Sequence, residues 1–155
     1  MLPAPKDPGP AVGVIGVVVV DHGSRRVEAN RAHETFVAAC RERLRHPVVE
    51  PAHMELAEPS IAIAFDRCVA AGAGTVVVAP YFLLPGDHWD RDLPALTAAA
   101  ASAHPGVRWL VAAPLGPDPL LMDLVDRKVA HCLAHAAGDA PECAACAGTG
   151  NCTLR

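Results

Sequence analysis

The sequence predicts an α/β fold: one domain with a mostly parallel, four-stranded sheet and helices on both of its faces. The first observation is that short apolar runs of strand length alternate four times with longer segments whose apolar residues recur at helical spacing. The second is size, because 155 residues, 52% of them apolar, suffice for one domain with a proper core but hardly for two.

The first strand-helix unit begins with the apolar run 17–20 and continues into a helix that stops at Pro47. The apolar residues that define this helix are Ala32, Phe36, Val37, Cys40 and Leu44. Residues 48–56 predict the second strand. Pro51 lies within it and cannot donate a ladder hydrogen bond, so we expect this strand at an edge of the sheet.

The second helix is predicted to begin at Pro59 and to end at a left-handed glycine, either Gly72 or Gly74. Its buried stripe is expected to comprise Ile61, Ala64, Phe65, Cys68 and Val69. The two remaining units follow the same pattern. Their strands and helices are expected at residues 75–79, 90–104, 107–113 and 119–136.

Three regions are expected along the chain: a disordered, proline-rich lead (1–11), the α/β domain (12–137) and a cysteine-rich tail (138–155). The lead is either the remnant of a removed transit peptide or a native tail. Residues 11–20 are apolar, but they are too few to span a bilayer and no small-residue cleavage site follows them. We therefore expect no membrane association, and six cysteines that are reduced thiols or metal ligands instead of disulfides.

Charge and composition argue against a nucleic-acid partner. The formal net charge is -4 and only 4% of the residues are aromatic. A protein that binds the phosphate backbone normally carries a basic excess and stacks bases on aromatic side chains. An anionic ligand would therefore have to be recognised by a local cluster of cations.

Two histidines that follow predicted strands are the main functional signal. His22 directly follows the run 17–20, and His88 closes the loop after the third strand. Because ligands of open α/β sheets bind outside the carboxyl ends of the strands, the two imidazoles are expected to face each other across a pocket. Glu55 and Glu58, from the end of the second strand and the next turn, would complete a set that binds a divalent metal and accepts protons.

The residues around this site suit a flat, anionic ligand. Arg25, Arg26 and Arg31 lie at the start of the first helix, whose unpaired N–H groups and positive dipole end could also hold carboxylates. The loop 81–86 is unusually apolar for a connection, which a flat hydrophobic ligand would explain. The predicted ligand contacts are Ser24, Arg25, Arg26, Phe82, Leu83, Pro85 and Gly86.

Simpler interpretations compete with several of these assignments. His22 could merely satisfy a helix start, and Glu58 could act only as a helix-entry carboxylate. Asp92 could belong to a solvated helix start or could orient His88. His53 is expected to pack or to bind backbone.

Other histidines and cysteines have both structural and functional interpretations. His131 and His135 are one helical turn apart and could chelate a metal, although imidazoles are also favoured near the negative end of a helix. Cys40 and Cys68 lie on apolar stripes and are expected to be core thiols.

Three motifs resemble one protein family closely. They are DHGSRR (21–26), EPAHMELAEPSI (50–61) and PGDHW (85–89). In this order they resemble the small CbiX/SirB-type chelatases, most closely the sirohydrochlorin ferrochelatases (SirB) of plants and algae, over about residues 14–155. The resemblance implies a homodimer of flavodoxin-like protomers that inserts Fe2+ into sirohydrochlorin to form sirohaem, with His22 and His88 as the catalytic pair.

The chemistry of the candidate residues is consistent with this resemblance. We predict that His22 and His88 bind Fe2+ and accept the pyrrole protons, with Glu55 assisting by its charge and as a proton relay. The alternatives are a sirohydrochlorin cobaltochelatase, since imidazole accepts both metals, and a non-catalytic tetrapyrrole or metal carrier. We expect the protein in the chloroplast stroma if it comes from a plant or alga, and in the cytoplasm otherwise.

The tail is predicted to bind a metal. Cys143, Cys146 and Cys152 place three thiols within ten residues, and a fourth ligand must come from Cys132 or from a partner subunit. Resemblance to the plant chelatases favours a 2Fe-2S cluster. The CxxCxGxG pattern over 143–150 instead resembles a zinc-binding unit of J-domain chaperones, and a disordered redox-sensing tail is the third interpretation.

Overall fold

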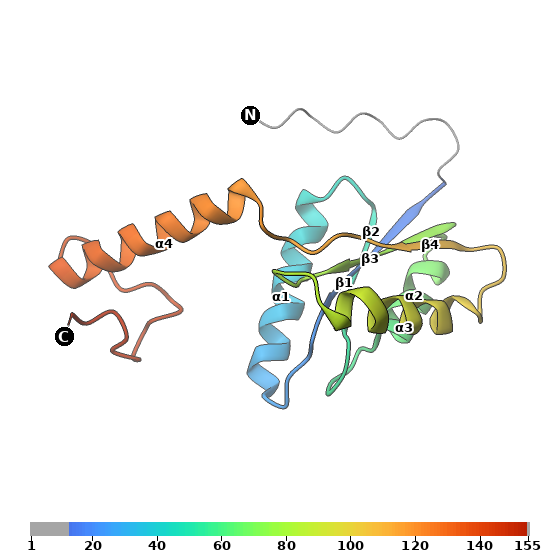
Figure 1. Ribbon diagram of the computed structural model, residues 1–155, viewed down its shortest axis with the longest axis horizontal. Coiled ribbons are helices and arrows are strands. Elements are labelled where there is room, and N and C mark those ends of the chain that lie inside the picture. Colours follow the sequence, from blue (N-terminus) through green and yellow to red (C-terminus); the bar gives the residue numbers. More distant parts are fainter. Residues whose placement is uncertain (1–12, 155) are drawn as a thin grey trace. The chain divides into compact units, whose positions relative to one another are not determined.

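A computed structural model describes residues 13–154 (Figure 1). The proline-rich lead expected at 1–11 lies outside the described residues. The chain divides into two compact units, of which the first ends at Leu115 and the second begins at Gly116. This division precedes the last helix, which was predicted to belong to the α/β domain, with the boundary after residue 137.

The four strands of the first unit form one parallel sheet in the order β2-β1-β3-β4. Its elements are β1 (Ile15–Asp21), α1 (Val27–Arg43), β2 (Val48–His53), α2 (Ile61–Ala70), β3 (Thr75–Pro80), η1 (His88–Asp92), α3 (Leu93–Ala101) and β4 (Arg108–Val111). The predicted fold class is confirmed. Pro51 lies in β2, which is an edge strand as predicted.

The apolar run of β1 contributes to a core on each face of the sheet. Val18 and Val20 pack in the cluster that contains Phe65 of α2, whereas Val17 and Val19 pack in the cluster formed with α1. Alternate residues of a strand point to opposite faces, so one run of valines serves both layers (Figure 1). Burying one such side chain stabilises a fold by about 1.5–3 kcal/mol, so this central strand provides a firm base for the turn that follows it.

The stripe predicted for the first helix is only partly right. The buried residues of α1 are His33 and Val37, while Phe36 and Leu44 are exposed. The helix packs mainly on the edge strand β2, so the covered strip is narrow. His33 is accommodated in this strip because its Nε2–H donates to the carbonyl oxygen of Val19 at 3.0 Å.

The stripe predicted for the second helix is largely confirmed. Ile61, Ala64, Phe65 and Cys68 of α2 are buried. Gly72 follows the helix with a φ of 92°, which is the left-handed conformation that was expected of it.

The second unit consists of α4 (Pro119–Ala137) and the cysteine-rich tail. The side chain of Asp118 caps α4 by accepting the N–H of Leu120 at 2.8 Å, and Gly138 ends it in the left-handed conformation. The tail runs back along α4 and brings Cys152 to Cys132 (Figure 1). Because helix and tail pack on each other, they form one unit, which explains the earlier boundary. Among residues 13–154, none of the helices is long and apolar enough to cross a membrane.

Candidate active site

The imidazoles of His22 and His88 lie side by side although the two residues are far apart in the sequence. His22 directly follows β1 and His88 begins η1, after the loop that leaves β3. The ring centroids are 5.1 Å apart, and about half of each side chain is exposed. The ends of two neighbouring parallel strands thus present two accessible imidazoles at one edge of the sheet.

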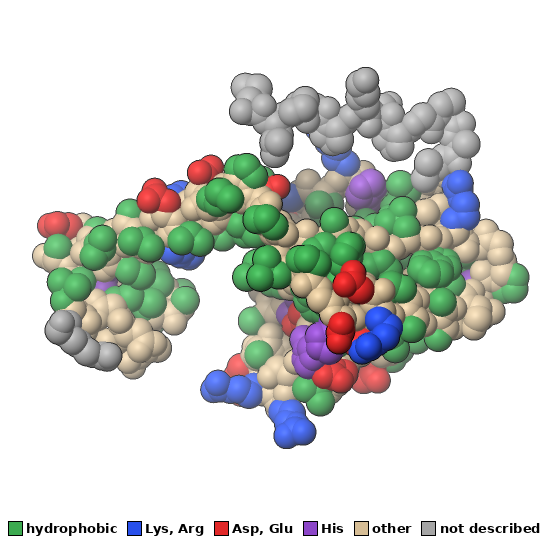
Figure 2. Space-filling model, viewed as in Figure 1, with side chains coloured by type: hydrophobic (Ala, Val, Ile, Leu, Met, Phe, Trp, Pro, Cys, Tyr) green, Lys and Arg blue, Asp and Glu red, His purple; other side chains and the backbone are tan. Residues whose placement is uncertain are grey.

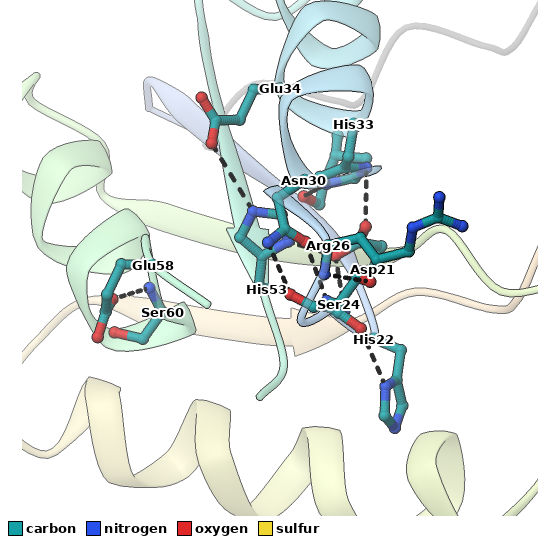
Figure 3. Close-up of polar contacts among 12 residues, drawn as sticks. Asp21, His22, Ser24, Arg26, Asn30, His33, Glu34, His53, Glu58 and Ser60 are labelled. Carbon is teal, nitrogen blue, oxygen red and sulfur yellow. Dashed lines mark hydrogen bonds and ion pairs between the residues drawn. The ribbon is translucent and has the colours of Figure 1, made fainter. Parts of the chain in front are cut away.

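A carboxylate accompanies one of these imidazoles. Oε1 of Glu55 lies 2.8 Å from Nε2 of His22, and the N–H of Glu55 donates to the carbonyl of His22 at 3.1 Å. The carboxylate of Glu58 instead accepts the N–H of Ser60 at the start of α2 (Figure 3). Glu55 is therefore the carboxylate of the histidine site, and Glu58 has the contact expected of a helix-entry residue.

A second carboxylate holds His88. Oδ2 of Asp92 accepts Nδ1–H of His88 at 2.8 Å, and Oδ1 accepts Nε–H of Arg91 at 3.1 Å. The hydrogen bond from His88, and then that from Arg91, lower the pKa of Asp92 below its usual value. With Nδ1 as the donor, Nε2 of His88 keeps its lone pair and can bind a metal ion or accept a proton.

We expect Asp92→Asn to lower the turnover number about 10- to 100-fold, because an amide orients the imidazole less firmly and does not stabilise its protonated form. The thermal unfolding midpoint should hardly change, since the side chain is near the surface. Steady-state kinetics and circular dichroism test this, with Asp90→Asn, an exposed carboxylate of the same segment, as the control. Equal losses in the two variants would contradict a role for Asp92 in orienting His88.

Gly23 allows the turns after β1 and β2 to approach each other. Its φ is 86°, and a Cβ atom at this position would lie 1.9 Å from the carbonyl oxygen of Glu55. An L side chain would therefore be strained by its own backbone conformation and would also push Glu55 away from His22.

We predict that Gly23→Ala lowers the free energy of unfolding by more than the roughly 1–3 kcal/mol that a strained backbone conformation costs, and that it removes most activity. Gly72→Ala is the matched control, because φ is 92° there but nothing lies within 4 Å of the added Cβ. Denaturant unfolding and turnover are measured for both variants. Similar activity in the two would show that the close approach at Gly23 is unimportant.

The predicted ligand contacts lie in two exposed segments next to the strand ends. Arg25 and Arg26 are exposed before α1, and within the described residues no side-chain hydrogen bond caps this helix end. Ser24 shapes the turn, because its Oγ accepts the N–H of Arg26 at 3.0 Å. In the second segment Leu83 is 61% exposed, while Phe82 packs partly against the core. Pro85 and Gly86 are also exposed.

The surface around the histidines combines polar and apolar side chains. Figure 2 shows a histidine patch on the sheet-bearing unit, bordered by acidic and basic side chains and by hydrophobic side chains. Such a surface can contact the face of a flat ring system and the charged groups at its rim.

A polar network with two buried histidines lies beside the site and was not predicted from the sequence. His53 ends β2 and is fully buried, as expected, but its Nδ1 lies 2.5 Å from Oδ1 of Asp21 and so binds a carboxylate in place of backbone. His33 lies on the other side of Asp21, with 3.8 Å between its Nδ1 and Oδ2 (Figure 3). In the sequence, the position of Asp21 at the end of a strand could have indicated a polar contact. That His53 is its partner becomes evident only when β1 and β2 are paired.

Three cysteines of the second unit converge. The Sγ atoms of Cys132, Cys146 and Cys152 all lie within 4.8 Å of one another, and those of Cys132 and Cys152 are 3.6 Å apart. Cys143 is close by, since its carbonyl accepts the N–H of Cys146 at 3.0 Å. The N–H and then the thiol of Cys146 lower the pKa of Cys143, while the thiols of Cys152 and Cys143 raise the pKa of Cys146 to about 12.

The other histidines and cysteines have different surroundings. Nδ1 of His135 donates to the carbonyl of Ala140 at 3.0 Å, whereas Nε2 of His131 is buried without a hydrogen-bond partner among the described residues. Cys68 is fully buried, and this burial raises its pKa to about 12, as expected for a core thiol. Cys40 is half-buried.

Comparisons with known proteins agree with the architecture. The CbiX family model matches residues 16–132. The chloroplastic sirohydrochlorin ferrochelatase of Arabidopsis thaliana is 55% identical over 139 residues, which are 90% of this chain and 62% of that protein. The sirohydrochlorin ferrochelatase of Bacillus subtilis is 35% identical over 102 residues, which are 66% of this chain and 39% of that protein.

A solved structure shows the same fold. SirB from Bacillus subtilis with Fe3+ has a TM-score of 0.68 and 32% sequence identity, covering 78% of this chain and 46% of that one. The chain thus spans less than two thirds of the length of each of these three relatives.

Proposed function

Because this chain belongs to the CbiX family, we propose that it inserts Fe2+ into sirohydrochlorin and releases two protons to form sirohaem. The observation that carries the proposal is the 5.1 Å approach of the His22 and His88 rings, with Glu55 2.8 Å from His22. Imidazole ligates Fe2+ and accepts protons near neutral pH, which are the two tasks that metal insertion requires.

The half-exposed imidazoles can act in sequence on the metal and on the protons. His22 and His88 hold Fe2+ while it loses water. As the ion moves into the macrocycle, two pyrrole N–H bonds break. The imidazole nitrogens that the ion has left then accept the two protons. Glu55 balances the positive charge on His22 and, being 52% exposed, can pass the proton on to water.

The neighbouring segments supply the contacts that a carboxylated macrocycle needs. Arg25, Arg26 and the adjoining end of α1 offer positive charge to peripheral carboxylates. The exposed loop residues bury apolar surface against the ring, and they are Phe82, Leu83, Pro85 and Gly86. Ser24 contributes by shaping the turn between His22 and Arg26.

An anaerobic assay of the purified chain with sirohydrochlorin and either Fe2+ or Co2+ tests the proposal. We expect the absorption spectrum of sirohaem to develop with Fe2+ faster than the uncatalysed reaction. Turnover with Co2+ alone would instead identify a cobaltochelatase, an outcome that imidazole ligands also allow. A shifted macrocycle spectrum without turnover would identify a carrier.

We further propose that the tail holds a 2Fe-2S cluster through Cys132, Cys143, Cys146 and Cys152. The support is the donor set, because three of these thiols already converge within 4.8 Å and the fourth is hydrogen-bonded to Cys146. Four cysteine thiolates suit such a cluster, and they also suit tetrahedral zinc. When bound, the cluster would supply one-electron chemistry and cross-link the tail to α4.

Anaerobic purification distinguishes the two metals. A 2Fe-2S cluster gives a brown protein with visible absorption and equal amounts of iron and acid-labile sulfide. A colourless protein with stoichiometric zinc would instead establish the zinc site, and the cluster proposal would then be abandoned.

We also propose a homodimer, located in the chloroplast stroma if the chain comes from a plant or alga. The chain covers only 46% of SirB from Bacillus subtilis, so two copies would match its length, and the edge strand β4 exposes Trp109 and Leu110. The relative from Arabidopsis thaliana is chloroplastic. Light scattering after gel filtration should give twice the mass of the chain, and a monomer would contradict the proposal.

A further inference from the structure

A buried polar network lies directly behind the turn that carries His22 (Figure 3). Asp21 ends β1, His53 ends β2, and these two residues are partners in the register of the sheet. His33 and Glu34 of α1 complete the network. His53 is fully buried and His33 is 5% exposed, whereas the carboxylates of Asp21 and Glu34 reach toward the surface, so the two histidines are the interior part of the network.

Asp21 connects the two turns of the site. Its Oδ1 accepts Nδ1–H of His53 at 2.5 Å and the N–H of Gly23 at 3.0 Å. The first bond reaches the strand that leads into Glu55, and the second reaches the turn that contains His22. One carboxylate oxygen therefore ties together the backbone segments that carry the two interacting side chains.

The segment after β2 needs such an anchor. The carbonyl of Asp21 accepts the N–H of Met54 at 2.8 Å, and Glu55 then bonds to the carbonyl of His22. Leu56 follows with a φ of 67°, a left-handed conformation that a leucine adopts only at an energetic cost. A segment with such a strained backbone conformation keeps Glu55 in place only if the end of β2 before it is held firmly by hydrogen bonds.

Stability alone does not account for a histidine at this position. Nε2 of His53 has no hydrogen-bond partner among the described residues, and its nearest charged atom is Oε1 of Glu34 at 3.9 Å. An unsatisfied buried nitrogen is costly, whereas a leucine would fill a similar volume without that cost. The benefit must therefore come from the bond that Nδ1 makes to Asp21.

We propose that Asp21 and His53 are positioning residues of the chelatase site, and that their bond sets the contact between Nε2 of His22 and Oε1 of Glu55. The inference rests on the proposed function, because it assigns the network a role in proton acceptance at His22. Neither residue touches the macrocycle or the metal in this scheme. They act through the geometry of the two turns.

The first test compares two substitutions of the same side chain. His53→Leu removes the donor, whereas His53→Asn keeps an N–H close to the position of Nδ1. We expect His53→Leu to lower kcat for Fe2+ insertion about 10- to 100-fold with KM within about twofold of wild type, the loss expected from a displaced catalytic group. His53→Asn should restore most of the lost kcat.

The second test asks whether His53 acts through Glu55. If it does, His53→Leu should have little further effect in a Glu55→Ala background, because alanine removes the acceptor of the His22 contact that His53 positions. Phe65→Leu, a buried substitution in α2, controls for lost stability and should lower the unfolding midpoint without this loss of kcat. Independent, multiplying effects of the two substitutions, or equal damage from His53→Asn and His53→Leu, would overturn the inference.

A readout that does not require turnover separates this inference from the proposed function. The imidazole 15N resonances of His22 should show a hydrogen-bonded Nε2 in wild type and in His53→Asn, but not in His53→Leu. If wild type shows this signature and no chelatase activity, the proposed function fails and the positioning of His22 stands. If the His22 resonances are the same in all three proteins, the positioning inference is wrong.

Discussion

Replacing either His22 or His88 with alanine is expected to lower the turnover number for Fe2+ insertion by at least about a hundredfold, the lower end of what a general base contributes. Each imidazole in the proposed mechanism first binds the ion and then accepts a proton, and alanine can do neither. The free energy of unfolding should change little, because both side chains are about half exposed and their removal leaves no cavity.

His104→Ala is the matched control for both variants. His104 also lies near the surface and also contacts a carboxylate, with 2.6 Å between its Nε2 and Oδ1 of Asp66, but it is not part of the candidate site. Turnover is measured anaerobically at saturating sirohydrochlorin, and stability by urea unfolding. A His22→Ala or His88→Ala protein with near-normal turnover would rule out the proposed catalytic pair.

The second large effect is expected at the cysteine group. Cys132→Ala should reduce the metal content of the purified protein to near zero, because Cys132 is the ligand proposed on α4 and its Sγ lies beside those of the tail cysteines Cys146 and Cys152. The second unit should then lose its fold, since within the described residues no residue of α4 is fully buried. Units below about 40 residues usually need a metal, a disulfide or a partner to stay folded.

Metal analysis and limited proteolysis measure both parts of this result. The tail of Cys132→Ala should be cut rapidly while the sheet-bearing unit resists, and removal of the metal from wild type by a chelator should have the same effect. Cys40→Ala is the control, because this half-buried thiol lies in α1, outside the cysteine group. Full metal content in Cys132→Ala would show that another residue provides the fourth ligand.

The spacing of apolar residues predicted which side chains are buried in the sheet-bearing unit, wherever a strand or helix is covered by other elements along its whole length. The valine run of β1 and the apolar stripe of α2 are buried as predicted, since residue spacing alone determines which side chains share a face. The stripe of α1 was predicted less well. That helix covers only a narrow strip at the edge of the sheet, and a histidine with a backbone partner took a place that an apolar residue was expected to fill.

The sequence by itself determined the class of the fold and the strand ends at which His22, Glu55 and His88 lie, because parallel strands bring their carboxyl ends to one edge. Only the tertiary structure decided that Glu55 and not Glu58 meets His22, that Asp21 binds His53, and that Cys132 joins the tail cysteines. Each of these contacts joins residues that are distant along the chain. In the first case two glutamates of the same turn were also alternative partners for one histidine. Their distances depend on strand register and turn geometry, which hydrophobic spacing does not specify.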